Sequence, residues 1–242
     1  MHRNIFHQSS WASTSSGTPI ELYKKSHTMS GFSEQPILFI GGVHGDEPEG
    51  VRLATELLAW LQENEKTQSE KIHPWILIPC INPDGYSHHQ RTNGNGVDLN
   101  RNFPCRDWSP EAKAPRYYPG PSPGSEAEVR ALVKLIEDEK PQLIVHFHSW
   151  EPCVVFTGHP GQKAAETLAT GTGYECREDI GYPTPGSLGQ FGWIEHQIPV
   201  ICIEEQEHID LNLVWPHFRQ GLELLLTNSS NAGVQTERKE SR

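Results

Sequence analysis

The chain has 242 residues and a formal net charge of -11, and these properties exclude several classes of protein. Its 20 Lys and Arg residues are outnumbered by 31 Asp and Glu residues and are scattered, so we expect no nucleic-acid partner. No apolar run approaches the roughly 18 uninterrupted residues of a membrane-spanning helix, so we expect no membrane insertion. The length allows a sizeable core and does not force a division into two domains.

The cysteines and the first residues of the chain favour a reducing cellular compartment. The five cysteines are odd in number and not closely paired, and two of them lie inside apolar runs. This usage is typical of a reducing environment. Residues 1–23 lack the apolar core of a secretory signal. We therefore expect a cytoplasmic protein.

Strands and helices alternate along the chain. Short apolar runs bounded by turn residues predict buried strands at 36–42, 75–81, 142–148 and 198–204. Helical spacing of apolar residues predicts helices at 47–65 and 211–226, and a third opens in the segment 124–139, where Ser125 and Glu128 suggest a capping box. We predict one α/β domain over 1–227, with a mixed, mostly parallel sheet between helices on both faces, and a flexible polar tail at 228–242.

Polar side chains that suit catalysis follow each predicted strand. In sheets of this kind ligands bind at the carboxyl ends of the strands, so we expect these side chains to meet at one edge. The residues concerned are His44, Asp46 and Glu47 after the first run, Asn82 and Asp84 after the second, His148 at the end of the third, and Glu204 with Glu205 at the end of the fourth.

Three of these residues form a candidate metal site. A histidine, a carboxylate three residues later and a distant second histidine are the ligand set of a catalytic zinc with one position open for water, and His44, Glu47 and His148 fit it. A lone His-x-x-Glu is common by chance, and one of His146 and His148 could be a core histidine. Their coincidence at one sheet edge favours the metal site.

Several motifs together carry a family resemblance. The segments GGVHGDE, INPDG, GVDLNRNFP, PGSEAEV, FHSW and ICIEE occur in this order between about Ile37 and Glu205. This order resembles the zinc metallocarboxypeptidases of the pancreatic carboxypeptidase superfamily. More narrowly, with GYPTPGS, it is similar to the bacterial murein tripeptide amidases, which cleave the bond between γ-D-glutamate and diaminopimelate.

The resemblance implies a ligand set and a catalytic base. It assigns one Zn²⁺ per chain to His44, Glu47 and His148, and the general acid/base role to Glu204. The adjacent Glu205 is the alternative base. Because successive strand residues point to opposite faces, only one of the two can reach the metal.

The resemblance also implies residues that bind substrate. Arg91 matches the arginine that stabilises the oxyanion, and Asn100 with Arg101 matches the pair that binds a terminal carboxylate. Tyr182 is a candidate for the mobile tyrosine over the site, and Leu188 falls near the position that lines the side-chain pocket.

Two further residues have a structural alternative. Asp84 could simply form a turn with Asn82 as its cap, and Asp46 could orient a ligand histidine or cap a helix. The pair Ser149-Trp150, which follows His148, differs from the Ser-Tyr of the digestive enzymes and the Asp-Pro of the murein amidases, and this leaves the shape of the substrate subsites open.

We therefore predict a zinc amidase or peptidase that cleaves an amide next to a residue with a free carboxylate, most specifically in a murein-derived peptide. Alternatives are a carboxypeptidase that removes C-terminal or side-chain glutamates from proteins, an N-acyl amino acid deacylase similar to aspartoacylases, and an inactive zinc-binding module. The intact ligand, base and arginine set argues against the last.

Overall fold

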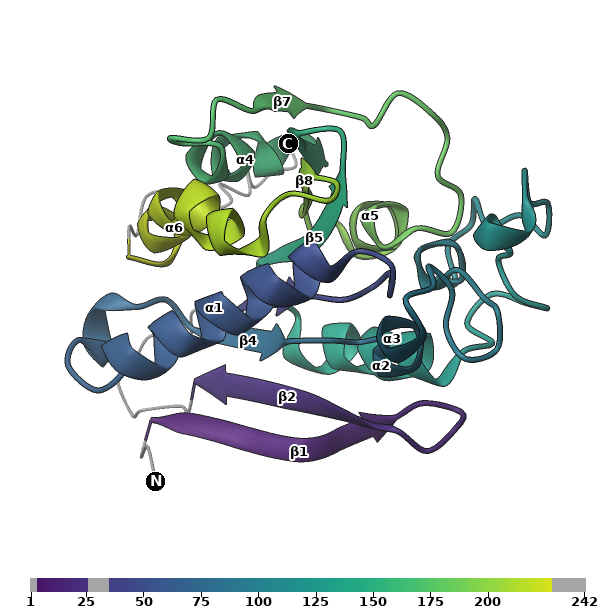
Figure 1. The fold of residues 1–242 in the computed structure, drawn as a ribbon, viewed down its shortest axis with the longest axis horizontal. Helices are drawn as coiled ribbons and strands as arrows, with labels where there is room; N and C mark the ends of the chain where they lie inside the picture. Colours follow the sequence, from purple (N-terminus) through teal and green to yellow (C-terminus); the bar gives the residue numbers. More distant parts are fainter. Residues whose placement is uncertain (1–3, 26–34, 228–242) are drawn as a thin grey trace, which may run out of the picture.

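The computed structural model describes residues 4–25 and 35–227, which form one domain around an eight-stranded sheet (Figure 1). The strand order is β1-β2-β4-β3-β5-β8-β6-β7. The predicted tail at 228–242 lies outside the described residues. The strands are β1 (Ile5–Ser13), β2 (Pro19–Lys25), β3 (Ile37–Ile40), β4 (Trp75–Ile78), β5 (Leu143–Trp150), β6 (Cys153–Thr157), β7 (Glu175–Arg177) and β8 (Val200–Gln206).

The four strands predicted from apolar runs form the centre of the sheet. β4, β3, β5 and β8 are neighbours and pair in parallel, and all four residues of β3 and of β4 are buried. β5 continues two residues beyond the predicted end, to Trp150, and β8 continues to Gln206. The prediction of a mixed, mostly parallel sheet is confirmed, with antiparallel pairs toward its two edges.

The outer strands were missed by the sequence patterns. The β1–β2 hairpin lies at one edge of the sheet and β7 at the other (Figure 1). Most residues of β1 are exposed or half-buried, so β1 has no apolar alternation to reveal it, and β7 has only three residues. In β2, Ile20 and Leu22 are buried and do alternate.

Helices cover both faces of the sheet, as predicted. One apolar core lies between the sheet and α1, α4 and α6, and a second lies between the sheet and α3 with the α5 segment. None of the described helices combines the length and the apolar character that crossing a membrane requires. The bounds are α1 (Pro48–Asn64), α2 (Pro83–His88), α3 (Ala127–Glu139), α4 (Gln162–Leu168), α5 (Leu188–Gln190) and α6 (Leu211–Thr227).

The start of α3 differs from the prediction. The helix begins at Ala127, and its N-cap is Glu126 without a side-chain capping bond. The Ser125 hydroxyl donates instead to the Glu126 carboxylate at 2.6 Å, and Glu128 accepts a hydrogen bond from the Asn93 amide at 3.2 Å. The predicted capping box is therefore wrong, because a distant loop binds the carboxylate that would have closed it.

Two glycines allow the turn after β3 to pack against neighbouring backbone. A Cβ at Gly45 would lie 2.0 Å from the carbonyl carbon of Gly85, and one at Gly50 would lie 2.4 Å from the carbonyl oxygen of Phe147. Any larger residue would push this turn and the start of α1 away from α2 and β5. The glycines thus fix the segment between them at the carboxyl edge of the sheet.

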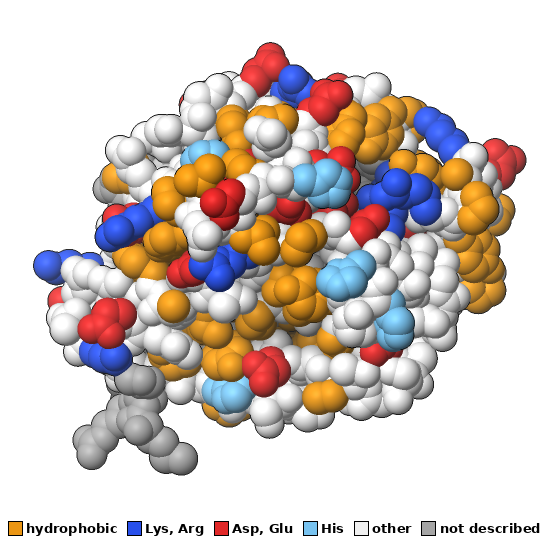
Figure 2. All heavy atoms as spheres, viewed as in Figure 1, with side chains coloured by type: hydrophobic (Ala, Val, Ile, Leu, Met, Phe, Trp, Pro, Cys, Tyr) orange, Lys and Arg blue, Asp and Glu red, His pale blue; other side chains and the backbone are white. Residues whose placement is uncertain are grey.

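Charged side chains are mixed over the surface. On the face that Figure 2 shows, Lys and Arg are interspersed with Asp and Glu and share the surface with apolar side chains.

Candidate active site

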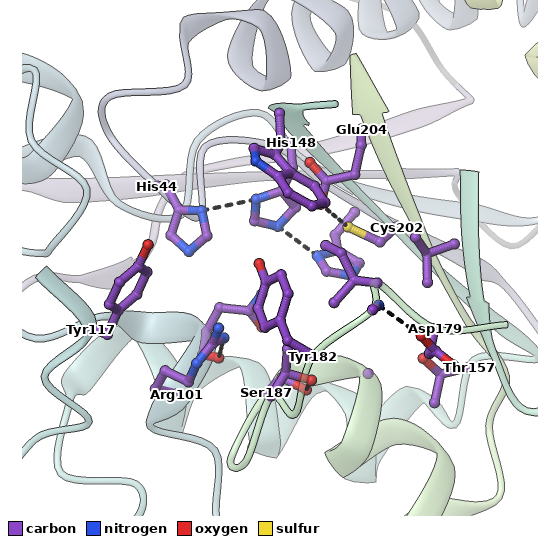
Figure 3. A pocket seen from close by; sticks show the side chains of 18 of the residues that line it. His44, Arg101, Tyr117, His148, Thr157, Asp179, Tyr182, Ser187, Cys202 and Glu204 are labelled. Atoms are coloured by element: carbon purple, nitrogen blue, oxygen red, sulfur yellow. Dashed lines mark hydrogen bonds between the residues drawn. The ribbon is translucent and has the colours of Figure 1, made fainter. Parts of the chain in front are cut away.

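A cavity of about 630 Å³ opens at the carboxyl ends of β3, β5 and β8. It is lined by polar and charged side chains that come from segments far apart in the sequence (Figure 3). Of the nine predicted site residues, eight line it. These are His44, Glu47, Arg91, Asn100, Arg101, His148, Tyr182 and Glu204.

The three predicted metal ligands meet at the cavity floor. Their candidate ligand atoms all lie within 4.8 Å of one another. The Nδ1 atoms of His44 and His148 are 3.0 Å apart, and each lies 2.7 Å from an oxygen of Glu47. All three side chains are buried, so their convergence is built into the fold.

The outer nitrogen of each histidine also has a partner. His44 Nε2 lies 3.2 Å from Asp98 Oδ1, and His148 Nε2 lies 2.8 Å from His146 Nδ1. Hydrogen bonds of this kind fix the tautomer and ring orientation of metal-binding histidines. Sequence reasoning did not assign Asp98, although it lies inside the GVDLNRNFP motif, and it treated His146 as a possible core histidine.

The electrostatics suit a cation bound by these three residues. Burial opposes the charge on Glu47, but the nearby His44 and His148 hold the pKa of Glu47 well below its usual range. Burial lowers the pKa of His148, so this imidazole is neutral with a lone pair to donate. Two imidazole nitrogens and one carboxylate are the protein ligands of a catalytic zinc, and the donor set therefore fits that ion.

The two adjacent glutamates of β8 point to opposite faces of the sheet. Glu204 lines the cavity, and burial together with the Glu47 charge raises the pKa of Glu204 to about 8. The Cys202 thiol donates to Glu204 Oε1 at 3.2 Å. Glu205 lies on the other face, where it accepts hydrogen bonds from Tyr174 and His217.

A rigid loop brings the arginines to the cavity. Arg91 donates through Nε to Asp98 at 2.9 Å and through Nη1 to Glu47 at 3.2 Å. It therefore also helps to fix the position of the predicted metal ligand Glu47. Arg101 is buried and donates to the carbonyl oxygen of Asn100 at 2.7 Å. In Figure 3, Arg101 and Tyr182 lie across the cavity from Glu204.

The loop that carries these residues is held by buried amide side chains. Asn93 donates to the carboxylates of Glu126 and Glu128, and Asn102 accepts from the backbone N–H of Glu126 while donating to the carbonyl oxygen of Pro119 at 2.7 Å. Buried polar groups that are fully hydrogen-bonded confer rigidity. The loop therefore presents its arginines in fixed positions.

The prediction that Leu188 lines the substrate pocket is wrong. Leu188 is fully buried in the second apolar core, and its backbone N–H donates to Asn100 Oδ1 at 2.9 Å. Its neighbours Ser187 and Gly189 line the cavity instead. The side-chain direction of this short helix explains the difference, because adjacent residues on it face the core and the cavity.

Two aromatic residues stand at the cavity mouth. Trp150 and Tyr182 are both partly exposed, and their rings pack edge to face at 5.9 Å between centroids. Trp150 is the residue at which the sequence departs from the families that it resembles, and it contributes to the cavity lining.

The two uncertain aspartates have structural partners. Asp84 accepts hydrogen bonds from the hydroxyls of Ser16 and Thr18 in the β1–β2 turn, and Asn82 Oδ1 caps α2 by accepting from a backbone N–H at 2.9 Å. Asp46 pairs with Arg116 at 3.0 Å and does not contact a ligand histidine. Asp98 takes the orienting position that was considered for Asp46.

The sequence profile of the zinc carboxypeptidase family matches residues 1–175, and the chain belongs to this family. The family comprises hydrolases, and the fold and the cavity chemistry agree with that class. Tyr182 and Glu204 lie beyond the matched segment.

The chain is also similar in sequence to individual proteins. The chain is 35% identical over 170 residues to murein peptide amidase A of Escherichia coli K12. This aligned segment covers 66% of this chain and 66% of that protein. Over 179 residues it is 31% identical to murein peptide amidase A of Vibrio campbellii, covering 69% and 68% of the two chains. The matched segment thus spans about two thirds of these relatives.

Solved structures agree with this likeness. The crystal structure of murein-tripeptide amidase from Escherichia coli O157 superposes with a TM-score of 0.70 at 27% identity, covering 92% of this chain and 91% of that one. Carboxypeptidase A from Helicoverpa armigera superposes with a TM-score of 0.79 at 17% identity over 97% of this chain and 70% of that one. The second match concerns the fold alone.

Proposed function

We propose that the protein is a zinc-dependent amidase that hydrolyses an amide bond next to a residue with a free carboxylate. The observation that carries this proposal is the convergence of His44, Glu47 and His148 at the floor of a cavity that also contains Glu204 and two arginines. A bound zinc ion would lower the pKa of water toward neutrality and polarise the scissile carbonyl.

The residues around the metal ligands have complementary roles in the proposed reaction. Glu204 removes a proton from the attacking water and returns it to the leaving amine, and its raised pKa, about 8, suits the return of the proton. Arg91 places a fixed positive charge where the oxyanion develops. Arg101, with Asn100, binds the free carboxylate of the leaving residue through charge-assisted hydrogen bonds. Tyr182 closes the mouth of the cavity over the bound peptide.

The substrate that we propose is a murein-derived tripeptide, cut between γ-D-glutamate and diaminopimelate. The names of the two relatives described above and of the Escherichia coli structure support it. The cavity chemistry is compatible, because diaminopimelate carries two carboxylates and an additional ammonium group. The cavity lining offers both signs of charge, because it includes Arg116 as well as Glu178, Asp179 and Glu207.

We propose a cytoplasmic location and a catalytic unit within residues 1–227. The five cysteines are all free thiols, as expected in a reducing compartment. Fragments of peptidoglycan that enter the cytoplasm during turnover of the cell wall would then be the source of the peptide.

The proposal is tested by incubating zinc-loaded protein with L-Ala-γ-D-Glu-meso-diaminopimelate and measuring released diaminopimelate. We expect release that stops after the metal is removed with a chelator and returns with zinc. A benzoyl dipeptide ending in lysine, in glutamate or in phenylalanine serves as the carboxypeptidase control, and N-acetyl-aspartate as the deacylase control. Cleavage of a control substrate with no release from the tripeptide would refute the proposed substrate.

A further inference from the structure

Each of the two nitrogens of the His148 ring has a close polar partner (Figure 3). Nδ1 faces the metal cluster, at 2.7 Å from Glu47 Oε2, and Nε2 faces away from it, at 2.8 Å from His146 Nδ1. The second contact joins two imidazole rings, so its direction depends on which ring carries the proton. No role follows for His146 from the family resemblance.

The chemistry of metal binding decides this direction. A neutral imidazole has one N–H and one lone pair. For Nδ1 of His148 to offer its lone pair to a metal, the single proton of His148 must lie on Nε2. Nε2–H can then donate only if His146 Nδ1 is unprotonated. If His146 donated instead, the proton of His148 would lie on Nδ1 and would block the ligand lone pair.

We propose that His146 is a positioning residue for the metal site, which locks His148 into the tautomer and orientation that bind zinc by accepting its Nε2–H. This inference rests on the metal binding that the proposed function requires, but not on the reaction or its substrate. Asp98 has the equivalent position at His44, so an aspartate holds one ligand and a neutral imidazole holds the other.

The fold holds His146 in a fixed place. His146 and His148 are two residues apart on β5, so both point to the same face of the sheet. Their side chains are buried, with relative exposures of 3% and 2%, and solvent competes poorly for either nitrogen. Strands pair with β5 on both sides, and they place Ile40 and Cys202 in register with His146.

The role is tested with two substitutions at position 146 that differ in one property. His146→Asn keeps an acceptor oxygen near the position of Nδ1, whereas His146→Leu fills similar space without an acceptor. We expect the leucine variant to bind zinc about 10–100-fold more weakly, measured by competition with a chromophoric chelator, and the asparagine variant to stay close to the wild type. The absorption spectrum of the cobalt-substituted protein should change in the leucine variant.

A control separates this role from packing. Ile40→Val removes volume beside His146 in the neighbouring strand without removing an acceptor from His148, so zinc affinity should stay near that of the wild type. Thermal unfolding of each metal-free variant checks the fold. Wild-type zinc affinity in a folded His146→Leu protein would overturn the proposal, and so would an equal loss in both His146 variants.

A measurement on the unmodified protein covers the case in which the leucine variant does not fold. Nitrogen-15 NMR of the zinc-loaded protein should find the proton of His146 on Nε2 and an unprotonated Nδ1. A proton on His146 Nδ1 would contradict the proposal. Because zinc affinity and tautomer are read without substrate, a protein that passes these tests and cleaves no tripeptide would refute the proposed function alone.

Discussion

His44 Nε2 lies 3.2 Å from Asp98 Oδ1, although the two residues are 54 positions apart in the chain. Both side chains are buried, and the carboxylate that orients His44 also accepts from Arg91 Nε at 2.9 Å. His44, Arg91 and Arg101 hold the pKa of Asp98 far below its usual range even though burial opposes its charge. One aspartate thus connects a metal ligand to the arginine of the proposed oxyanion site.

We expect Asp98→Asn to weaken zinc binding by about 10–100-fold, because an amide is a poorer partner for the Nε2–H of His44 and the ion pair between Arg91 and Asp98 is lost. Chelator competition measures the effect. Asp84→Asn is the control, because it alters a buried aspartate that contacts the β1–β2 turn and not the cavity. Equal zinc affinity in Asp98→Asn and the wild type would refute the orienting role.

The two glutamates at the end of β8 should differ in what they affect. Glu204→Gln removes the proposed base and should lower kcat by about 10²–10⁴-fold with zinc still bound. Steady-state kinetics and metal analysis on the same samples measure both quantities. Retained turnover in this variant would remove Glu204 from the mechanism.

Glu205→Gln should instead reduce stability. This carboxylate is 1% exposed and accepts from Tyr174 and His217 on the opposite face of the sheet. Loss of a charged partner in a buried network costs about 1–3 kcal/mol, which denaturant unfolding can detect. We expect its kcat to remain near that of the wild type, and a loss as large as that of Glu204→Gln would contradict the assignment.

Arg101→Lys should raise KM more than it lowers kcat. A planar guanidinium can make two parallel bonds to a carboxylate, and an ammonium group cannot reproduce them. Loss of about 1.5–3 kcal/mol of charged hydrogen bonding corresponds to a KM increase of roughly 10-fold or more. The control is Arg106→Lys, since Arg106 pairs with Glu195 and is well exposed. A large fall in kcat with an unchanged KM would argue against carboxylate binding by Arg101.

The Cys202 thiol should influence the pH dependence of the reaction. Burial raises the pKa of Glu204 to about 8, and the hydrogen bond from Cys202 opposes this rise by stabilising the ionised form. Because the base acts when ionised, activity should increase as the pH rises through its pKa. Cys202→Ala should therefore move the acid limb of kcat/KM to higher pH, and Cys202→Ser should restore it in part. An acid limb that is unchanged or moves to lower pH would contradict this coupling.

The sequence predicts the central sheet and the ligand set because both depend on local pattern. The runs that become β3, β4, β5 and β8 are mostly apolar, and their carboxyl ends must meet at one sheet edge. His44, Glu47 and His148 lie at or just after the ends of such runs, so their meeting can be inferred from the sequence.

Other features of the fold and of the site depend on contacts between distant residues, which no local sequence pattern encodes. Asp98 reaches His44 only because buried amides fold the long loop over the cavity, and Glu128 is bound by Asn93 instead of closing a capping box. β1 was missed because most of its residues face solvent. Leu188 was assigned from the family resemblance, and a nearby family position does not decide which of two adjacent residues faces the cavity.

The metal position tests the central claim most directly. X-ray diffraction from crystals of the zinc-loaded protein, collected at the zinc absorption edge, should show one anomalous peak per chain. It should lie about 2.0–2.3 Å from Nδ1 of His44, Nδ1 of His148 and an oxygen of Glu47. A peak bound instead by His146 and Cys202, or no peak at the three ligands, would contradict the account.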